Sequence, residues 1–150
     1  MNLKICKLHH DAIVPAYQTE GAACFDLHAI GTSGGGDYMQ TICRTGLAFE
    51  VPEGWALLIY SRSGQAFNNS VRLGNCVGVI DADYRGEVLV KLQRDKPWKS
   101  EPRLLAKAGD RIAQAMLVQV PRITFEVCEQ LSLTERGEQG FGSTGQGGAA

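Results

Sequence analysis

Three features that would place a protein in a membrane, export or nucleic-acid-binding class are missing or weak in this sequence. Its longest apolar run, Trp55–Tyr60, is far too short to cross a bilayer, and the first seventeen residues lack the apolar core of a signal peptide. The formal net charge of -1 at pH 7 gives no basic field to capture long nucleic acid. We therefore expect a soluble, cytoplasmic protein that binds neither membranes nor nucleic acid.

Closely spaced cysteine pairs are also absent. The chain has five cysteines, which are Cys6, Cys24, Cys43, Cys76 and Cys128. They show no CxxC spacing, and an odd number cannot pair completely within one chain, so we interpret them as reduced thiols of a cytosol-like compartment. His9, His10 and His28 lack a spacing partner for a metal site and are interpreted as surface or capping residues.

What the sequence does contain is frequent glycine and proline, which leaves no room for a long helix. Short stretches of β-type residues lie between them, at 3–5, 47–51, 57–59, 88–92, 112–120 and 123–127. One short helical turn is expected over residues 63–69. A chain of 150 residues has the usual size of one domain, and the pattern predicts an all-β sandwich or barrel.

The composition changes at residue 134, where glycine becomes dense and Phe141 is the only large apolar side chain. Such a segment cannot bury enough surface to order itself. We expect residues 1–133 to form the folded domain and residues 134–150 to form a flexible arm. A tail without a role is one interpretation. The other is an arm that wraps an anion, since a cation and hydroxyl groups stand on its glycine-rich backbone.

Four further segments are rich in chemically useful residues, at 21–29, 61–66, 74–87 and 109–114. The SRSGQA segment suits a phosphate, because arginine supplies forked donors, serine a further donor and glycine a close backbone approach. In the third segment, Asp81 stands between two strand patterns, which predicts a β-hairpin with a carboxylate at its turn. Each segment alone is also consistent with an ordinary turn, and Asp26 with a structural carboxylate.

Taken in order, CFDLHA, SRSGQA, GVIDADYRGE, GDRIAQ and RGEQGFGSTG resemble the five motifs of the trimeric deoxyuridine triphosphatase family. The resemblance spans residues 21–145. Ser61 replaces a proline and Cys24 a glycine that many relatives carry, but no reacting group is lost. The resemblance implies a jelly-roll-like distorted barrel of the β-clip type. It also implies a homotrimer in which the C-terminal arm of one subunit closes over the active site of a partner subunit.

The resemblance further implies the hydrolysis of dUTP to dUMP and pyrophosphate, with Asp81 as the general base for water attack on the α-phosphorus. Mg²⁺ would travel on the triphosphate without a direct protein ligand, and Asp26 would lie in its outer shell. The resemblance also implies contacts with each part of the substrate. The phosphate oxygens would be held by Arg62, Ser63 and Gly64, with Gln114 on the phosphate nearest the sugar. Tyr84 would contact the deoxyribose, uracil would be read by Asn75, Val79 and Ile80, and further contacts would come from Leu89 and, in the arm, from Arg136, Phe141, Gly142, Ser143 and Thr144.

These residue types suit that reaction. Cleavage adds negative charge to an anionic group, so positioning and charge stabilisation must supply most of the rate enhancement. Main-chain N–H and C=O groups held in a hairpin would match uracil and mismatch cytosine, at about 1 to 3 kcal/mol per mismatched buried group. A ring at Tyr84 would crowd a ribose 2′-hydroxyl. The reaction would limit uracil incorporation into DNA and supply dUMP for thymidylate synthesis.

Two alternatives stay open at this point. A dCTP deaminase has a similar fold, but it would need a catalytic glutamate near residues 80–84, where this chain has Ile-Asp-Ala-Asp-Tyr. A regulatory module could instead keep the nucleotide pocket and signal to a partner protein.

Overall fold

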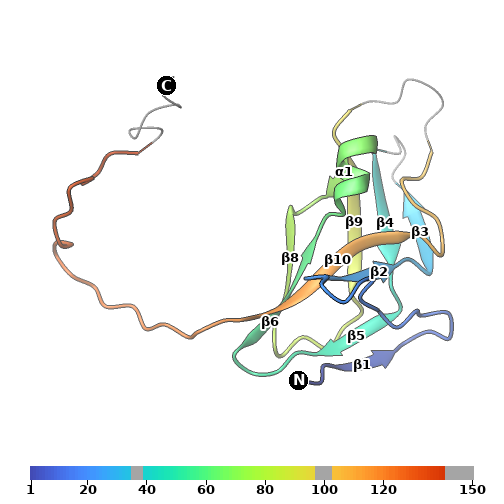
Figure 1. The fold of residues 1–150 in the computed structure, drawn as a ribbon, viewed down its shortest axis with the longest axis horizontal. Helices are drawn as coiled ribbons and strands as arrows, with labels where there is room; N and C mark the ends of the chain where they lie inside the picture. The colour runs from blue at the N-terminus through green and yellow to red at the C-terminus, as the bar shows by residue number, and fades with distance from the viewer. Residues whose placement is uncertain (35–38, 97–102, 141–150) are drawn as a thin grey trace.

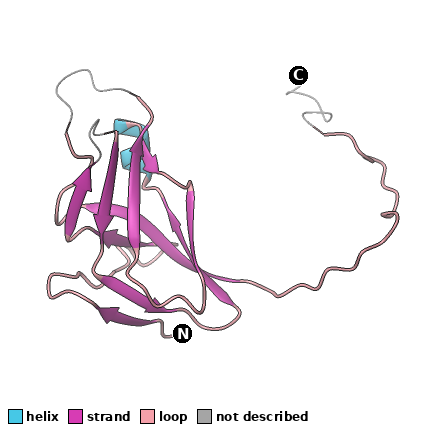
Figure 2. Cartoon of the chain, turned by 180° about the vertical axis from the view of Figure 1, so that it is seen from behind, coloured by secondary structure: helices cyan, strands magenta, loops and turns pink. Residues whose placement is uncertain are grey.

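The computed structural model describes residues 1–34, 39–96 and 103–140 (Figures 1 and 2). These residues contain ten strands and one short helix. In chain order they are β1 (Lys4–Lys7), β2 (Phe25–His28), β3 (Gly31–Gly34), β4 (Gln40–Arg44), β5 (Leu47–Glu50), β6 (Trp55–Tyr60), α1 (Ser63–Asn69), β7 (Val71–Leu73), β8 (Val77–Ile80), β9 (Leu89–Arg94) and β10 (Arg111–Gln119).

The strands form two antiparallel four-stranded sheets and one antiparallel pair. The first sheet has the order β2-β10-β6-β8, the second has the order β3-β4-β9-β7, and β1 pairs with β5. Side chains from both four-stranded sheets and from β5 meet in one core, which includes Leu57, Leu92 and Phe49. The fold is all-β and jelly-roll-like, as the sequence predicted.

Alternating burial explains why the β9 residues form a strand. Val90 and Leu92 point into the core, while Leu89 and Lys91 between them are exposed. Burying one such apolar side chain contributes about 1.5 to 3 kcal/mol, so the alternation fixes which face of the strand turns inward. Buried threonines tie loops to this core, since the Thr45 hydroxyl donates to the Val88 carbonyl at 2.7 Å.

The segment around Asp81 is not the β-hairpin that the sequence predicted. β8 pairs only with β6, whereas β9 pairs with β4 and β7 in the other sheet. Residues 81–88, called here the 81–88 crossover, therefore pass from one sheet to the other. The reason is burial at the end of the segment, where Val88 is in the core and its N–H donates to the Leu47 carbonyl at 2.8 Å.

The strand predicted at 123–127 is also wrong. β10 ends at Gln119, and residues 120–140 leave the body as an extended segment in which every residue is exposed (Figure 1). Phe125 and Val127 are 90% and 98% exposed. The apolar alternation there is real, but it packs on no sheet of the described residues, and an isolated strand leaves its backbone groups unpaired.

The short helix at residues 63–69 is confirmed as α1, which lies at one end of the body (Figure 1). The helix is capped by Ser70, which follows Asn69 in the left-handed conformation and whose N–H donates to the Ala66 carbonyl. Within the described ranges, no helix has both the length and the apolar character needed to cross a membrane.

Candidate active site

Asp26 on β2 organises a group of cationic side chains. Its Oδ1 accepts from Arg62 Nε at 3.0 Å, and its Oδ2 accepts from Arg111 Nη1 at 3.1 Å. The Asp26 side chain is only 9% exposed, while those of Arg62 and Arg111 are 25% and 43% exposed. A buried carboxylate thus holds two partly solvated guanidinium groups, which is an arrangement suited to an anionic ligand.

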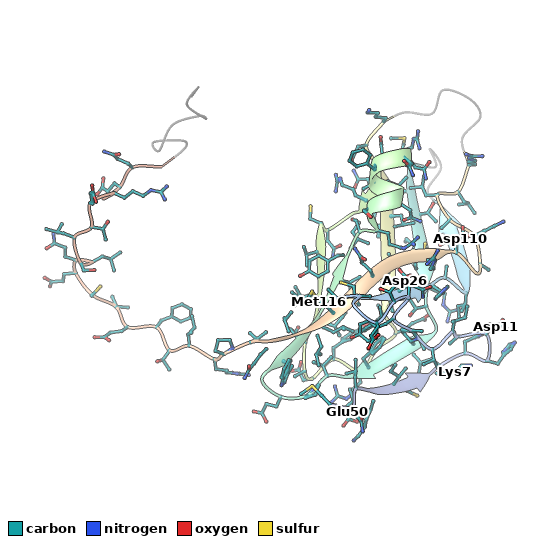
Figure 3. All side chains as sticks on the ribbon, viewed as in Figure 1. Lys7, Asp11, Asp26, Glu50, Asp110 and Met116 are labelled. Carbon is teal, nitrogen blue, oxygen red and sulfur yellow. The ribbon has the colours of Figure 1, made fainter. Side chains whose placement is uncertain are left out.

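Strand register explains why these residues meet, although they are far apart in the sequence. Asp26 pairs with Gln114 on β10, and Gln114 pairs with Tyr60 on β6, so the three residues form a row across the sheet. Figure 3 shows Asp26 in this part of the body. Arg62 follows the end of β6, and the Gln114 amide donates to the Ser61 carbonyl at 2.9 Å. The first, second and fourth motifs therefore converge at one end of the sheet.

The start of α1 is fastened to β10 at the same place. Gln65 Nε2 donates to the Arg111 carbonyl at 3.2 Å, and Arg62 Nη1 donates to the same carbonyl at 3.3 Å. Ser63 and Gly64 lie between these anchors and are exposed. The segment predicted to hold phosphate is therefore open to solvent on a fixed backbone.

β8 is an edge strand of its sheet, with β6 on one side. An edge strand presents main-chain N–H and C=O groups that are not used in a ladder, and such groups can recognise the polar edge of a base. Asn75 precedes β8 in a tight turn, where its carbonyl accepts from the Val77 N–H at 2.7 Å. Val79 is exposed, Ile80 is half-buried, and Leu89 at the start of β9 is exposed.

The 81–88 crossover carries Asp81 and Tyr84. Within the described part of the chain, the exposed Asp81 carboxylate has no hydrogen bond or ion pair, so it is free to accept a proton. Tyr84 is held more firmly, because its N–H donates to the Asp81 carbonyl at 3.2 Å and its hydroxyl donates to the Glu87 carbonyl at 3.0 Å. Gly86 lies against the tyrosine ring, where an added Cβ would be only 2.6 Å from Cζ.

Glu87 anchors the far end of the crossover. Its carboxylate accepts from Arg44 Nη2 at 3.0 Å and from the Gly46 N–H at 2.8 Å. The sequence reading missed the positioning roles of Glu87, Arg44 and Gln65. Arg111 also received no role in the sequence-based prediction, because no local sequence pattern reveals that it reaches back to Asp26 on β2.

The structure does not bring Asp81 close to Arg62 within one chain. Ile80 pairs with Leu57, and Arg62 lies five residues further along the extended chain, so the backbones of Ile80 and Arg62 are roughly 17 Å apart at 3.4 Å per residue. Gln114 is on the Arg62 side of this gap. The residues predicted to act on one phosphate thus occupy opposite ends of the sheet.

The arm contributes one described candidate, Arg136, whose Nε donates to the Gln139 carbonyl at 2.8 Å and which is exposed. Phe141, Gly142, Ser143 and Thr144 lie outside the described residues.

Two cysteines near the sheets have altered acidity. Burial, with a smaller contribution from the negative charge of Asp26, raises the pKa of the Cys24 thiol. Burial and the charge of Asp110 raise the pKa of Cys43 to about 12. Both thiols are therefore poorer nucleophiles at neutral pH than a thiol with the usual pKa.

The fold and the arginine cluster define an all-β, jelly-roll-like protein with an open site suited to an anion. The dUTPase family model matches residues 10–145. The deoxyuridine 5'-triphosphate nucleotidohydrolases of Helicobacter hepaticus and Nautilia profundicola are 43% and 44% identical to this chain. Each alignment covers 97% of this chain, and they cover 89% and 100% of the two relatives. The chain belongs to the dUTPase family.

Solved structures agree with this assignment. The dUTPase of Staphylococcus bacteriophage 80alpha with dUPNHPP is 26% identical, with a TM-score of 0.81 over 97% of this chain and 99% of that one. The dUTPase of phage phi11 of S. aureus, in a D95N mutant described with a structural Mg(II) ion, shares the fold at 19% identity and a TM-score of 0.74. That match covers 87% of this chain and 98% of that one.

Proposed function

We propose that this chain is a dUTP diphosphatase, which hydrolyses dUTP to dUMP and pyrophosphate. The observation that carries the proposal is the match of the dUTPase family model over residues 10–145, together with relatives of the same name at more than 40% identity. The site supports it, since two arginines, an edge strand and a free carboxylate provide what phosphate binding, base recognition and water activation require.

Asp81 is the proposed general base. A water molecule attacks the α-phosphorus and gives its proton to the Asp81 carboxylate, while the bond from the α-phosphorus to the bridging oxygen breaks and pyrophosphate leaves. Arg62 and Gln114 are proposed to hold the phosphate oxygens, Asn75, Val79 and Ile80 to recognise uracil, and Tyr84 to pack on the deoxyribose. The partner-free state of Asp81 among the described residues supports its role.

We propose that the active site forms between copies of the chain. The backbones of Ile80 and Arg62 are roughly 17 Å apart in one chain, and Gln114 lies on the Arg62 side, so Asp81 and the proposed phosphate-binding residues lie at different ends of the sheet. Placing the 81–88 crossover of one copy against the Asp26 cluster of a second copy resolves this separation. A homotrimer with shared sites is the assembly that the motifs imply.

The exposed segment after β10 fits the same assembly. Ile123, Phe125 and Val127 alternate with polar residues and are 69%, 90% and 98% exposed. Alternate apolar side chains are suited to adding a strand to another sheet, and docking on a second copy would bury them. That docking would carry residues 134–150, including Arg136, toward the active site of the partner.

Mg²⁺ fits this site only as a metal carried by the triphosphate. Both oxygens of Asp26 already accept from arginines, so the carboxylate is unsuited to direct coordination but keeps lone pairs for a metal-bound water. When bound, Mg²⁺ neutralises charge on the phosphates. The cytoplasmic location, the role in limiting uracil in DNA and any second, protein-binding role stay predictions of the sequence.

The test is a substrate panel of dUTP, dCTP, dTTP and UTP with Mg²⁺, scored for pyrophosphate and for ammonia and paired with a mass measurement in solution. We expect pyrophosphate from dUTP far faster than from the other three, and a mass of three chains. Ammonia from dCTP would instead identify a deaminase. Failure of a correctly folded trimer to cleave dUTP would overturn the proposal.

A further inference from the structure

The turn after β1 brings three metal-binding side chains together, none of which is assigned to dUTP. They are His9, His10 and Asp11, and one ligand atom of each lies within 4.8 Å of the other two. His9 Nδ1 is 3.6 Å from Asp11 Oδ2, and His10 Nε2 is 3.3 Å from Asp11 Oδ1. Asp11 is thus a neighbouring third donor, which the prediction for the histidines did not count.

The backbone of this turn is fixed by the body of the protein. The Leu8 N–H donates to the Gly46 carbonyl at 2.8 Å, and the Ala12 N–H donates to the His9 carbonyl at 3.1 Å. Gly46 has a φ of +66°, and an added Cβ there would lie 3.0 Å from Ala12 Cβ and 3.2 Å from His9 Cβ. Ala12 is buried. A turn held so closely loses little further backbone freedom when a ligand binds.

The donor set selects the class of metal. Imidazole nitrogens suit borderline ions such as Zn²⁺ and Ni²⁺, whereas Mg²⁺ requires oxygen ligands. In a tetrahedral zinc site with Zn–N bonds of about 2.0 Å, neighbouring ligand atoms are about 3.3 Å apart. The two His–Asp separations are close to that spacing. The two imidazole rings are stacked with centroids 4.3 Å apart, so both lie on the same side of the turn as neighbours.

Two neighbouring groups, the Asp11 N–H and the Lys7 ammonium, limit the affinity of this turn for a metal ion. His9 Nδ1 accepts a 3.2 Å hydrogen bond from the Asp11 N–H, which a metal bound at that nitrogen would replace. The Lys7 ammonium donates to the His10 carbonyl at 3.1 Å and places a positive charge beside the site. His10 and Asp11 are exposed, and His9 is partly exposed. Such a site binds more weakly than a closed structural zinc centre.

We infer that His9, His10 and Asp11 form a binding site for a divalent ion of the Zn²⁺ class, with water completing the coordination. Figure 3 places Asp11 and Lys7 at the edge of the body away from the departing arm. No residue of this turn belongs to the proposed dUTP site, so the inference does not depend on the proposed function.

Calorimetric titration of the full-length protein with zinc chloride tests the site. We expect one equivalent per chain in a saturable isotherm. His10→Ala and Asp11→Asn should each weaken binding at least about tenfold, since even partners outside the first coordination layer commonly matter that much. The matched control is Cys6→Ser, because Cys6 is an exposed thiol on neighbouring β1 that could capture zinc by itself.

The visible absorption spectrum of bound cobalt(II) is a second readout, which distinguishes imidazole and carboxylate ligands from a cysteine thiolate. Binding by imidazole and carboxylate produces weak visible bands without the intense thiolate-to-cobalt charge-transfer absorption. A wild-type isotherm that does not saturate, unchanged binding in His10→Ala, binding lost in Cys6→Ser, or a thiolate band with cobalt would each overturn the inference.

Discussion

Two aspartates on the same sheet have opposite surroundings. Asp26 is buried on β2 and accepts from two arginines, so its charge is compensated and its position is fixed. Asp81 follows the edge strand β8, is exposed, and has no hydrogen bond or ion pair within the described ranges. Their local sequences are similar, since each aspartate follows a short apolar stretch.

We propose that this difference separates a positioning carboxylate from a reactive one. A carboxylate whose oxygens are engaged by guanidinium groups is a poor base, but it can hold those groups in place for a ligand. A free carboxylate can take a proton from water, provided that substrate and partner subunit then surround it. We therefore assign Asp26 to positioning the arginines and propose Asp81 for the chemistry.

The largest expected effect is a loss of catalytic rate when Asp81 is replaced. Asp81→Asn should reduce kcat for dUTP by about 10² to 10⁴, the usual contribution of a general base, while unfolding is unchanged because the side chain has no partner to lose. Steady-state kinetics and denaturant unfolding measure both quantities. Asp83→Asn is the matched control, as it removes an exposed carboxylate two residues away. Near-normal turnover in folded Asp81→Asn would remove this residue from the reaction.

The second prediction concerns stability. Asp26→Asn should lower the free energy of unfolding by about 2 to 3 kcal/mol, because charged hydrogen bonds to two arginines are lost from a buried position. Asp95→Asn, which breaks the exposed pair with Arg72, should cost no more than about 1 kcal/mol. Urea titration of both variants gives the comparison. Equal losses would contradict the distinction between a buried and an exposed ion pair.

A smaller effect is expected beside Asp81, at Gly86. Gly86→Ala adds a methyl group against the ring of Tyr84, and should reduce the preference for dUTP over UTP by about 1 kcal/mol or more, the scale of a small misfit in a pocket. Tyr84→Ala should change the same ratio in the same direction. Gly21→Ala is the control, since its added Cβ meets no atom within 4 Å. An unchanged kcat/KM ratio in Gly86→Ala would argue against a specificity role for the tyrosine.

The smallest expected effect concerns the reactivity of Cys24, which precedes β2, and of Cys76, which precedes β8. Burial and the charge of Asp26 raise the pKa of Cys24, so less of its reactive thiolate is present at pH 8, whereas Cys76 before β8 is exposed. Iodoacetamide should modify Cys76 before Cys24. Cys43, with a pKa of about 12, should react last. Peptide mass spectrometry over time measures the order, and faster labelling of Cys24 than of Cys76 would contradict it.

Local sequence patterns were sufficient to predict several features of the protein. Apolar alternation at 88–92 predicted β9, the residues at 63–69 predicted α1, and the ordered motifs identified the family before any contact was known. These features are set by residues that are close in sequence, because an alternating strand pattern or a turn involves only a few consecutive residues.

Other features depended on residues that are distant in the sequence. Strand pairing placed β8 and β9 in different sheets, which turned the expected hairpin into a crossover, and it left the apolar residues at 123–127 without a surface in their own chain. Register across β2, β10 and β6 joined Asp26 to Arg62 and Arg111, up to 85 residues apart.

The sequence by itself thus determined several of the strands, the order of the motifs and the chemical groups available for the reaction. Only the tertiary structure decided which carboxylate is buried against arginines and which is left free. The physical reason is that burial and ion pairing are set by whatever packs across a sheet, and a residue's neighbours along the chain do not specify those contacts.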